Sequence, residues 1–542
     1  MAIFTVAAID TDFRSEKKGK AMKQRFAVSF LSAAVLALGA GAPTQAQAQE
    51  RPTIRVSSGA PDVGTLDPDR ATSTFDVGME SEIFNALVEF APGSANPKDI
   101  GPGLAQRWES TPDSKVWTFH LRHGVQFHGG YGELKASDVV YSLQRAADPK
   151  RSSFASNFAV IDKVEAPDDY TVRITLKYPD AAFLGVVSDY HGGYIISKAA
   201  AEKLGDKFGN APIGTGPFAF GEHVSQQYVK LVANDAYFRG KPKLDGIVYR
   251  MIPSDSAREL ALVSGEIDLA YGKREQRWVE RMRKQSGIKV DIFDPAEFRA
   301  LYINRTIKPM DVLKVRQAIA DAVNVDEIVR FAGKDVADKG CSAVPNGYLG
   351  EDCSVGTYPY DPAQSGKLLA EAGFPNGITI KSIVSNISAQ QPFMEIVQAQ
   401  LAKAGIKLEM EIVDHPTYQA KSRQNLSGLV FYGAARFPTA DSYLTEFYDS
   451  AASVGSPTAM SNFSHCSVAD SDIRAARVEP DPAKQLALWK DAQIKIHDDV
   501  CSIPLFGLKQ VWMRSSKVDY GYVLKGALNL QPPITEKTTL KP

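Results

Sequence analysis

The stretch ITIKSIVSNISAQQPFMEIVQAQLAKAGIKLEMEIV, residues 378–413, joins three segments of different hydrophobic period. Its two ends, ITIKSIVS and KLEMEIV, have the length and the apolar alternation of strands. Between them, Phe393, Val397 and Leu401 recur every four residues, as the buried face of a helix requires. The order strand, helix, strand predicts an α/β fold.

The same alternation extends outward in both directions along the chain. An opening strand and helix are expected at TIRVSSG (53–59) and VGMESEIFNALVEF (77–90), and one long helix at DVLKVRQAIADAVNVDEIVRFA (311–332). Further strands and helices follow one another in GIVYRMI (246–252), SDSARELALVSGEI (254–267), DLAYG (268–272), REQRWVERMRKQ (274–285) and IKVDIF (288–293). We therefore expect two α/β bodies joined by direct chain crossings.

Length and charge restrict the possible partners. A chain of 542 residues with 44% hydrophobic content is long enough for about two to four domains. Its 62 Lys and Arg nearly balance 63 Asp and Glu, so no chain-wide basic field favours nucleic acid or an anionic membrane. The residues that recognise the partner must therefore be sought in individual segments, because the net charge of the whole chain does not indicate a partner.

The N-terminus has the pattern of a secretory signal peptide. Basic residues precede the apolar run FAVSFLSAAVLAL (26–38), and AQA (46–48) offers small residues for cleavage. Cleavage there gives a mature chain starting at Gln49 with 56 basic and 60 acidic residues, a net charge of about −4. The acidic residues before Met22 are atypical of a signal peptide, which favours Met22 as the start. We expect a soluble periplasmic protein without a lipid anchor.

Four cysteines in an exported chain suggest disulfides, with three pairings possible. The loop CSAVPNGYLGEDC favours Cys341 with Cys353, worth roughly 2–3 kcal/mol. Cys466 with Cys501 then follows by elimination, and two buried free thiols are the alternative for this second pair.

Sequence templates for catalysis are absent. The chain contains no GxSxG, no GxxxxGK[ST] and no HExxH, and the mature part has no CxxC. The histidine group His120, His123 and His128 would place its members on opposite faces of a strand, which disfavours a shared metal. We expect no enzyme activity, no cofactor and no bound metal.

Several motifs, in order and spacing, resemble a known family: LAQRWESTPDSKVWTFHLRHGVQFHGG (104–130), KASDVVYSLQR (135–145), PIGTGPF (212–218), KVRQAIADAVNVDEIV (314–329) and YDPAQSGKLLAEAGF (360–374). The resemblance is to the dipeptide, oligopeptide and nickel-binding receptors of ABC importers, solute-binding protein family 5. It covers essentially the whole mature chain.

The resemblance implies a two-lobed periplasmic binding protein fold, type II-like and cluster C, with an extra subdomain in lobe I. Carried onto this chain, lobe I is residues 49–295, lobe II is 296–504, and 505–542 return to lobe I. The crossings DPAEFRALYIN (294–304) and CSIPLFGLK (501–509) are the expected hinges. The implied partners are a small-molecule solute and an inner-membrane ABC permease, with the receptor itself a monomer.

The segment FYGAARFPTADSY (431–443) departs from the family pattern. In dipeptide-binding relatives the corresponding turn carries an aspartate that pairs with the peptide's ammonium, and here Arg436 stands in its place. The relatives' carboxylate-binding arginine is also missing, with Gln391 or a neighbour at that position. Arg436 suits a carboxylate, phosphate or sugar-acid group. An anionic solute, including opine-like conjugates, is therefore expected in place of a simple dipeptide.

Alternatives remain for Arg436. It could form a structural salt bridge, with Asp441 as the suggested partner, or Asp441 could orient it toward solute. We expect Arg436→Ala to weaken solute binding by roughly 2–5 kcal/mol and to leave folding almost intact. The other candidate ligand-binding residues are Phe437, Asp441, Thr74, Phe75, Asp76, Tyr271, Gly272 and Gln391.

Other functions stay open at this point. A secreted enzyme on a related scaffold is the alternative class, and a nickel or haem receptor is a variant of the first. A chaperone or chemoreceptor side role is also compatible with the sequence. The solute itself is not named by the sequence, because pocket residues are distant along the chain.

Overall fold

The computed structural model describes residues 51–541 except 58, 181, 388 and 456–460; the expected signal peptide lies outside the described residues. These residues belong to one compact unit, Glu50–Pro542. The fold is mixed α/β, as the sequence predicts. In the described part of the chain no helix combines the length and the apolar character needed to cross a membrane.

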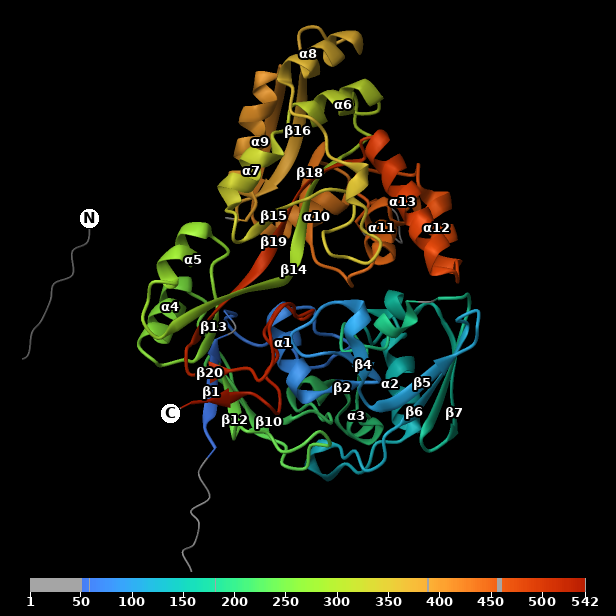
Figure 1. Ribbon diagram of the computed structural model, residues 1–542, viewed down its shortest axis with the longest axis vertical. Coiled ribbons are helices and arrows are strands. Elements are labelled where there is room, and N and C mark those ends of the chain that lie inside the picture. Colours follow the sequence, from blue (N-terminus) through green and yellow to red (C-terminus); the bar gives the residue numbers. More distant parts are fainter. Residues whose placement is uncertain (1–50, 58, 181, 388, 456–460, 542) are drawn as a thin grey trace, which may run out of the picture. The chain divides into compact units, whose positions relative to one another are not determined.

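The largest sheet joins strands from the two ends and the middle of the chain. Within the described residues it has nine strands: β10 (Phe218–Val224), β11 (Tyr228–Ala233), β12 (Gly246–Arg250), β1 (Thr53–Ser57), β13 (Leu269–Tyr271), β19 (Ser502–Ser515), β14 (Ile288–Ile303) and β18 (Leu429–Ala434) in this order, with β15 (Ala337–Lys339) paired to β19. The long strands β14 and β19 lie side by side and antiparallel (Figure 1). Their register shifts between Phe293 and Glu297, which marks an irregularity in the expected hinge segment.

The stretch 378–413 folds as its periodicity predicts. Strand β16 (Ile378–Ser385) pairs in parallel with β17 (Ile406–Val413), and helix α9 (Gln391–Lys403) connects them. Phe393, Val397 and Leu401 are buried in a large apolar cluster. A parallel pair needs such a crossover helix, so this unit forms from local sequence.

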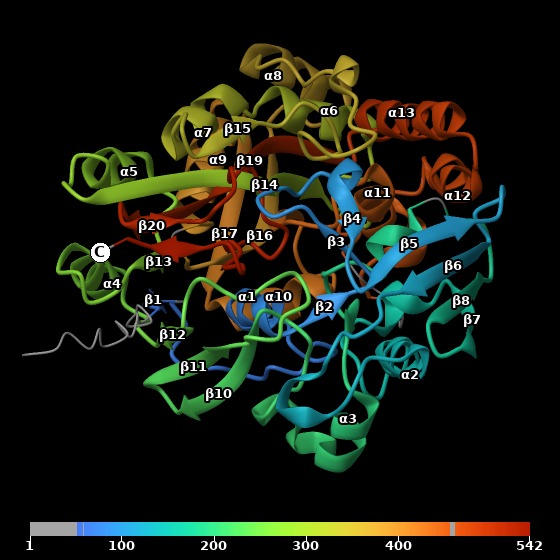
Figure 2. The same cartoon turned by 60° about the horizontal axis from the view of Figure 1, so that its bottom comes forward.

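A separate sheet forms in the N-terminal third. Its strands are β5 (Ala105–Ser110), β6 (Val116–Leu121), β8 (Thr171–Leu176) and β7 (Ile161–Asp168), all antiparallel. Helix α2 (Ala136–Ala146) packs against it, as Figure 2 shows. This sheet and helix have their own buried apolar cluster, which includes Phe119, Leu143 and Ile174.

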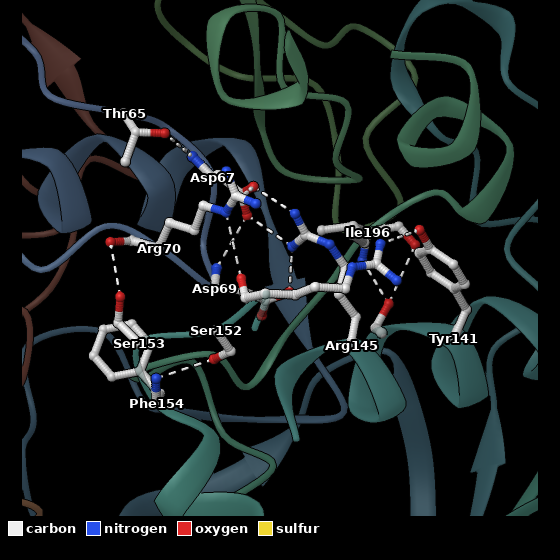
Figure 3. Close-up of polar contacts among 12 residues, drawn as sticks. Thr65, Asp67, Asp69, Arg70, Tyr141, Arg145, Ser152, Ser153, Phe154 and Ile196 are labelled. Atoms are coloured by element: carbon white, nitrogen blue, oxygen red, sulfur yellow. Dashed lines mark hydrogen bonds and ion pairs between the residues drawn. The ribbon is translucent and has the colours of Figure 1, made fainter. Parts of the chain in front are cut away.

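Arg145 at the end of α2 connects this helix to the loop that follows β1. Its guanidinium reaches Asp67, with Nη1 to Oδ1 at 2.7 Å, and also contacts Asp69 (Figure 3). All three side chains are 5% exposed or less, so one buried cation serves two buried carboxylates. Burial raises the pKa of Asp69 to about 7 against the lowering effect of Arg145.

Two expected helices differ in the structure. The predicted helix 77–90 is wrong in its second half: α1 (Thr74–Ile83) ends early, because β2 (Asn85–Ala86) pairs with residues 194–195 and β3 (Val88–Phe90) pairs with the nearby residues 100–102. The single helix expected over 311–332 is two helices, α6 (Leu313–Asp321) and α7 (Val325–Ala332). The Asn324 side chain accepts from Glu327 N and caps α7, a start signal inside the long pattern.

The remaining elements cover these sheets. They are α3 (Lys198–Leu204), α4 (Asp255–Val263), α5 (Gln276–Met282), α8 (Pro362–Glu371), α10 (His415–Arg423), α11 (Ala440–Tyr448), α12 (Asp470–Val478), α13 (Pro482–Asp498), β4 (Ile100–Pro102), β9 (Tyr194–Ile195), β20 (Val518–Asp519) and β21 (Thr539–Leu540).

Candidate functional site

A cavity of about 160 Å³ lies where the start of α1 meets the strands β13, β14 and β19. Gln510 and Trp512 reach it together because residues two apart on a strand share a face. The cavity combines aromatic walls with amide, hydroxyl and carboxylate groups, which is the composition of a site for a small polar organic molecule. Its lining residues are Ser73, Thr74, Phe75, Tyr271, Glu297, Gln510, Trp512, Leu530 and Gln531.

Three of the residues proposed from the sequence line this cavity: Thr74, Phe75 and Tyr271. Phe75 meets Tyr271 edge-on with ring centroids 5.6 Å apart, and Tyr271 meets Trp512 edge-on at 5.8 Å. Edge-to-face packing of this kind fixes aromatic rings in place. The fold therefore brings together residues about 200 positions apart, and their contact with solute stays a prediction.

Asp76 and Gly272 have structural surroundings instead. The buried Asp76 carboxylate accepts from the backbone N–H of Gly64 and Thr65, and burial raises its pKa to about 6. Gly272 N donates to Val511 O at 2.9 Å, and a Cβ there would lie 2.6 Å from the Trp278 ring. Asp76 holds the loop before α1, and Gly272 permits close packing behind the cavity.

Gln391 lies at the first position of α9 and donates to Glu395 on the same helix. Its neighbour Gln390 is the buried residue, accepting from Ser385 N and donating to the Phe431 carbonyl. Neither belongs to the cavity lining. Gln391 therefore begins a helix and Gln390 holds the backbone in place. A contact of Gln391 with solute stays a prediction.

Arg436 follows β18 and forms an ion pair with Glu446 of α11. Its Nε contacts one carboxylate oxygen and its Nη2 lies 2.5 Å from the other, while Nη1 donates to Ala435 O at 2.8 Å. The guanidinium carbon also lies 5.6 Å from the centre of the Phe447 ring. Three of the five N–H groups of the guanidinium are thus used within the protein, and Glu446 balances its charge.

The suggested pairing of Arg436 with Asp441 is wrong, because Asp441 lies 3.4 Å from Nε of Arg477 instead. Asp441 and Glu446 both belong to α11. Five residues correspond to about 140° around a helix, so the two carboxylates cannot face the same arginine. The partner of Arg436 is Glu446, five residues further along the same helix.

Phe437 packs against residues of the N-terminal third. Its ring lies 5.9 Å from that of Phe90, and a Cβ on Gly185 would come within 2.4 Å of it. Next to it, burial lowers the pKa of His191 to about 3, and the Arg436 charge adds to this effect. Arg436, Phe437 and Asp441 thus form a second group outside the cavity lining, at a contact between distant parts of the chain.

The sequence did not single out Glu297, Arg274 and Arg299. Glu297 lines the cavity and is paired with both arginines, with Oε1 2.9 Å from Arg274 Nη1 and Oε2 2.7 Å from Arg299 Nη2. Burial alone would raise the pKa of Glu297, but the two arginines lower it to about 2. The charges of Glu297 and Arg299, two positions apart in the otherwise apolar segment EFRALYI, were the available signal.

The cysteines form two disulfides in the structure, Cys341 with Cys353 and Cys466 with Cys501. The first closes the loop that follows β15, with Cys341 half-buried and Cys353 exposed. The second joins a fully buried pair across 35 positions of sequence.

The ion pair changes the expectation for Arg436→Ala. Glu446, 11% exposed in its side chain, would lose its cation, so unfolding should become easier by about 1–3 kcal/mol. Urea unfolding measures this loss. Adding Glu446→Gln to the same chain should recover part of it, because the buried charge is removed. Equal unfolding midpoints for wild type and Arg436→Ala would contradict this expectation and support the original one.

The fold and cavity define a two-lobed solute-binding protein. The chain belongs to the bacterial extracellular solute-binding proteins, family 5, whose family model matches residues 99–455. This confirms the resemblance drawn from the sequence motifs. The relatives it matches are binding proteins.

Three of these relatives are informative. The chain is 46% identical to the binding protein MoaA from A. tumefacien R10, solved in complex with mannopinic acid, with TM-score 0.81 over 91% of this chain and all of that one. It is 26% identical to AgaA from the same source, in complex with agropinic acid, with TM-score 0.75 over 90% of this chain and 99% of that one. Di/tripeptide-binding protein 2 of Pseudomonas aeruginosa is 30% identical, covering 89% of this chain and 94% of its own length.

Proposed function

We propose that this protein is the periplasmic receptor of an ABC importer and captures an opine-like organic acid. The observation that carries this proposal is the cavity, with Phe75, Tyr271 and Trp512 as walls and Gln510 and Gln531 as hydrogen-bonding groups. The cavity, about 160 Å³ in volume, offers aromatic walls and hydrogen-bonding groups together, as a polar organic solute requires. Likeness to the mannopinic acid complex supports the solute class.

The organisation of the receptor follows from the same proposal. Lobe I comprises residues 49–295 and 505–542, and lobe II residues 296–504, with β14 and β19 as the hinge strands. Solute binding closes the lobes, and the closed receptor docks on an inner-membrane permease as a monomer. Export through a cleaved N-terminal signal peptide places it in the periplasm.

Binding measurements test the proposal. Protein freed of bound molecules by unfolding and refolding is titrated calorimetrically with mannopinic acid, agropinic acid, a dipeptide and glutathione. We expect the opines to bind at least tenfold more tightly than the two peptides. Tight peptide binding with no opine binding would contradict the proposed solute and indicate a peptide receptor.

The same samples separate a receptor from an enzyme. Mass spectrometry after incubation should return the solute chemically unchanged, whereas an enzyme would give product. Solute that disappears over time in proportion to protein concentration would contradict the receptor function.

A further inference from the structure

The cavity borders a buried ionic group with one positive charge in excess, formed by Arg274, Glu297 and Arg299, which we call the arginine triad. Arg299 is 6% exposed, and the Arg274 and Glu297 side chains are 16% and 23% exposed. Two guanidinium groups share one carboxylate, so the formal charge is +1. Arg258, another buried arginine, donates to the carbonyl of the cavity residue Tyr271 and contacts the acid Asp255.

The two arginines reach Glu297 from different elements of the fold. Arg274 comes from the loop between β13 and α5, and Arg299 lies on β14 beside Gly433 of β18. A Cβ on Gly433 would lie 2.5 Å from the guanidinium carbon, so only glycine leaves room for it there. The position of Arg299 is thus fixed by packing, and Glu297 is the triad member that lines the cavity.

The triad is incompletely satisfied. Nε of Arg299 is buried without a hydrogen-bond partner among the described residues, and its Nη1 has only a long 3.5 Å contact to Ala389 O. Tyr271, Tyr418 and His415 are further titratable groups that interact with these charges, and the guanidinium carbon of Arg299 lies 5.9 Å from the centre of the Phe431 ring. A buried cation without a counter-ion is costly, and an anionic guest at this place would remove that cost.

We infer that Arg274 and Arg299 recognise a carboxylate of the solute, with Glu297 as their internal counter-ion. This inference rests on the proposed receptor function and names the chemistry of the same site. It transfers anion recognition from Arg436, whose charge Glu446 balances, to the triad, whose charge is in excess. The solute class is a small carboxylic acid whose polar remainder lies against Gln510 and Gln531.

The test uses the whole mature protein with two variants of opposite expected sign. Arg274→Gln removes a charge and should weaken mannopinic acid binding about 30-fold or more. Glu297→Gln removes the competing carboxylate and should leave this affinity unchanged or raise it. Arg277→Gln, an exposed arginine three residues on, is the control and should bind as wild type. Arg299 is left intact because its packing makes misfolding a risk.

A second measurement keeps the inference independent of the particular solute. Acetate, glutarate and glutamate should raise the thermal unfolding temperature of wild type more than acetamide does, and Arg274→Gln should abolish this difference. If no opine binds but this pattern appears, the proposed solute is wrong and the triad inference holds. Opine binding that Arg274→Gln changes less than threefold, loss of binding in Glu297→Gln, or equal effects of acetate and acetamide would overturn the inference.

Discussion

Replacing Arg145 by methionine should lower the free energy of unfolding by about 3–5 kcal/mol at pH 8. Arg145 is the cation that Asp67 and Asp69 share in a site from which water is excluded. Methionine keeps much of the side-chain volume and removes the charge, so the two buried carboxylates would keep only the half-exposed Arg70, 4.0 Å from Asp67, as a nearby cation. Urea unfolding followed by circular dichroism measures the loss.

The pH dependence has a definite sign. The pKa of Asp69 in the folded protein is raised to about 7 from 3.8, so the stability linked to its protonated form is complete below about pH 4 and is lost as pH rises to about 7. Without Arg145 the Asp69 carboxylate takes up a proton still more readily, because Arg145 lowers its pKa. The cost of Arg145→Met should therefore shrink from pH 8 to pH 5.

Arg70→Met is the matched control in the same group of residues. Its side chain is 41% exposed, pairs with the exposed Asp206 and lies 4.0 Å from Asp67, so its charge is largely screened by solvent and we expect a loss below about 1 kcal/mol. Adding Asp67→Asn and Asp69→Asn to Arg145→Met should restore part of the stability. A cost for Arg145→Met no larger than that of Arg70→Met, or one independent of pH, would contradict the role assigned to this arginine.

Removing the Cys466 to Cys501 disulfide with two alanines should lower the free energy of unfolding by about 3–4 kcal/mol. The crosslink spans 35 positions and so restricts the unfolded chain more than the one between Cys341 and Cys353, which spans 12. Both Cys466 and Cys501 are fully buried, so their smaller replacements also lose packing contacts. Chemical unfolding of oxidised protein measures the difference.

The double alanine variant of Cys341 and Cys353 is the control, with an expected loss of about 3 kcal/mol or less. Peptide mapping without reductant should show both pairs linked. Alkylation of Cys466 and Cys501 in unfolded, unreduced protein would contradict this pairing and favour the alternative of two buried thiols.

Local periodicity was sufficient wherever neighbours in sequence are neighbours in space. The strand, helix and strand of residues 378–413 formed as expected, because a parallel pair with its crossover helix is a local unit. Periodicity failed at residues 85–90, where pairing with β9 and β4 replaced the helix. The partner of residues 85–86 lies outside any local pattern, whereas residues 88–90 pair with residues 100–102, a local pairing that the helical period of 77–90 did not reveal.

The sequence by itself determined the fold class, the family and part of the cavity wall, Thr74, Phe75 and Tyr271, because motifs and periodicity are properties of contiguous residues. The sequence also showed that Arg436 departs from the family pattern, but it did not identify Glu446 as the partner of this arginine. Only the tertiary structure decided that Glu446 neutralises Arg436 while Arg274 and Arg299 share Glu297. The reason is electrostatic: whether a buried charge is balanced depends on which side chains lie within a few ångströms, and long-range packing sets those distances.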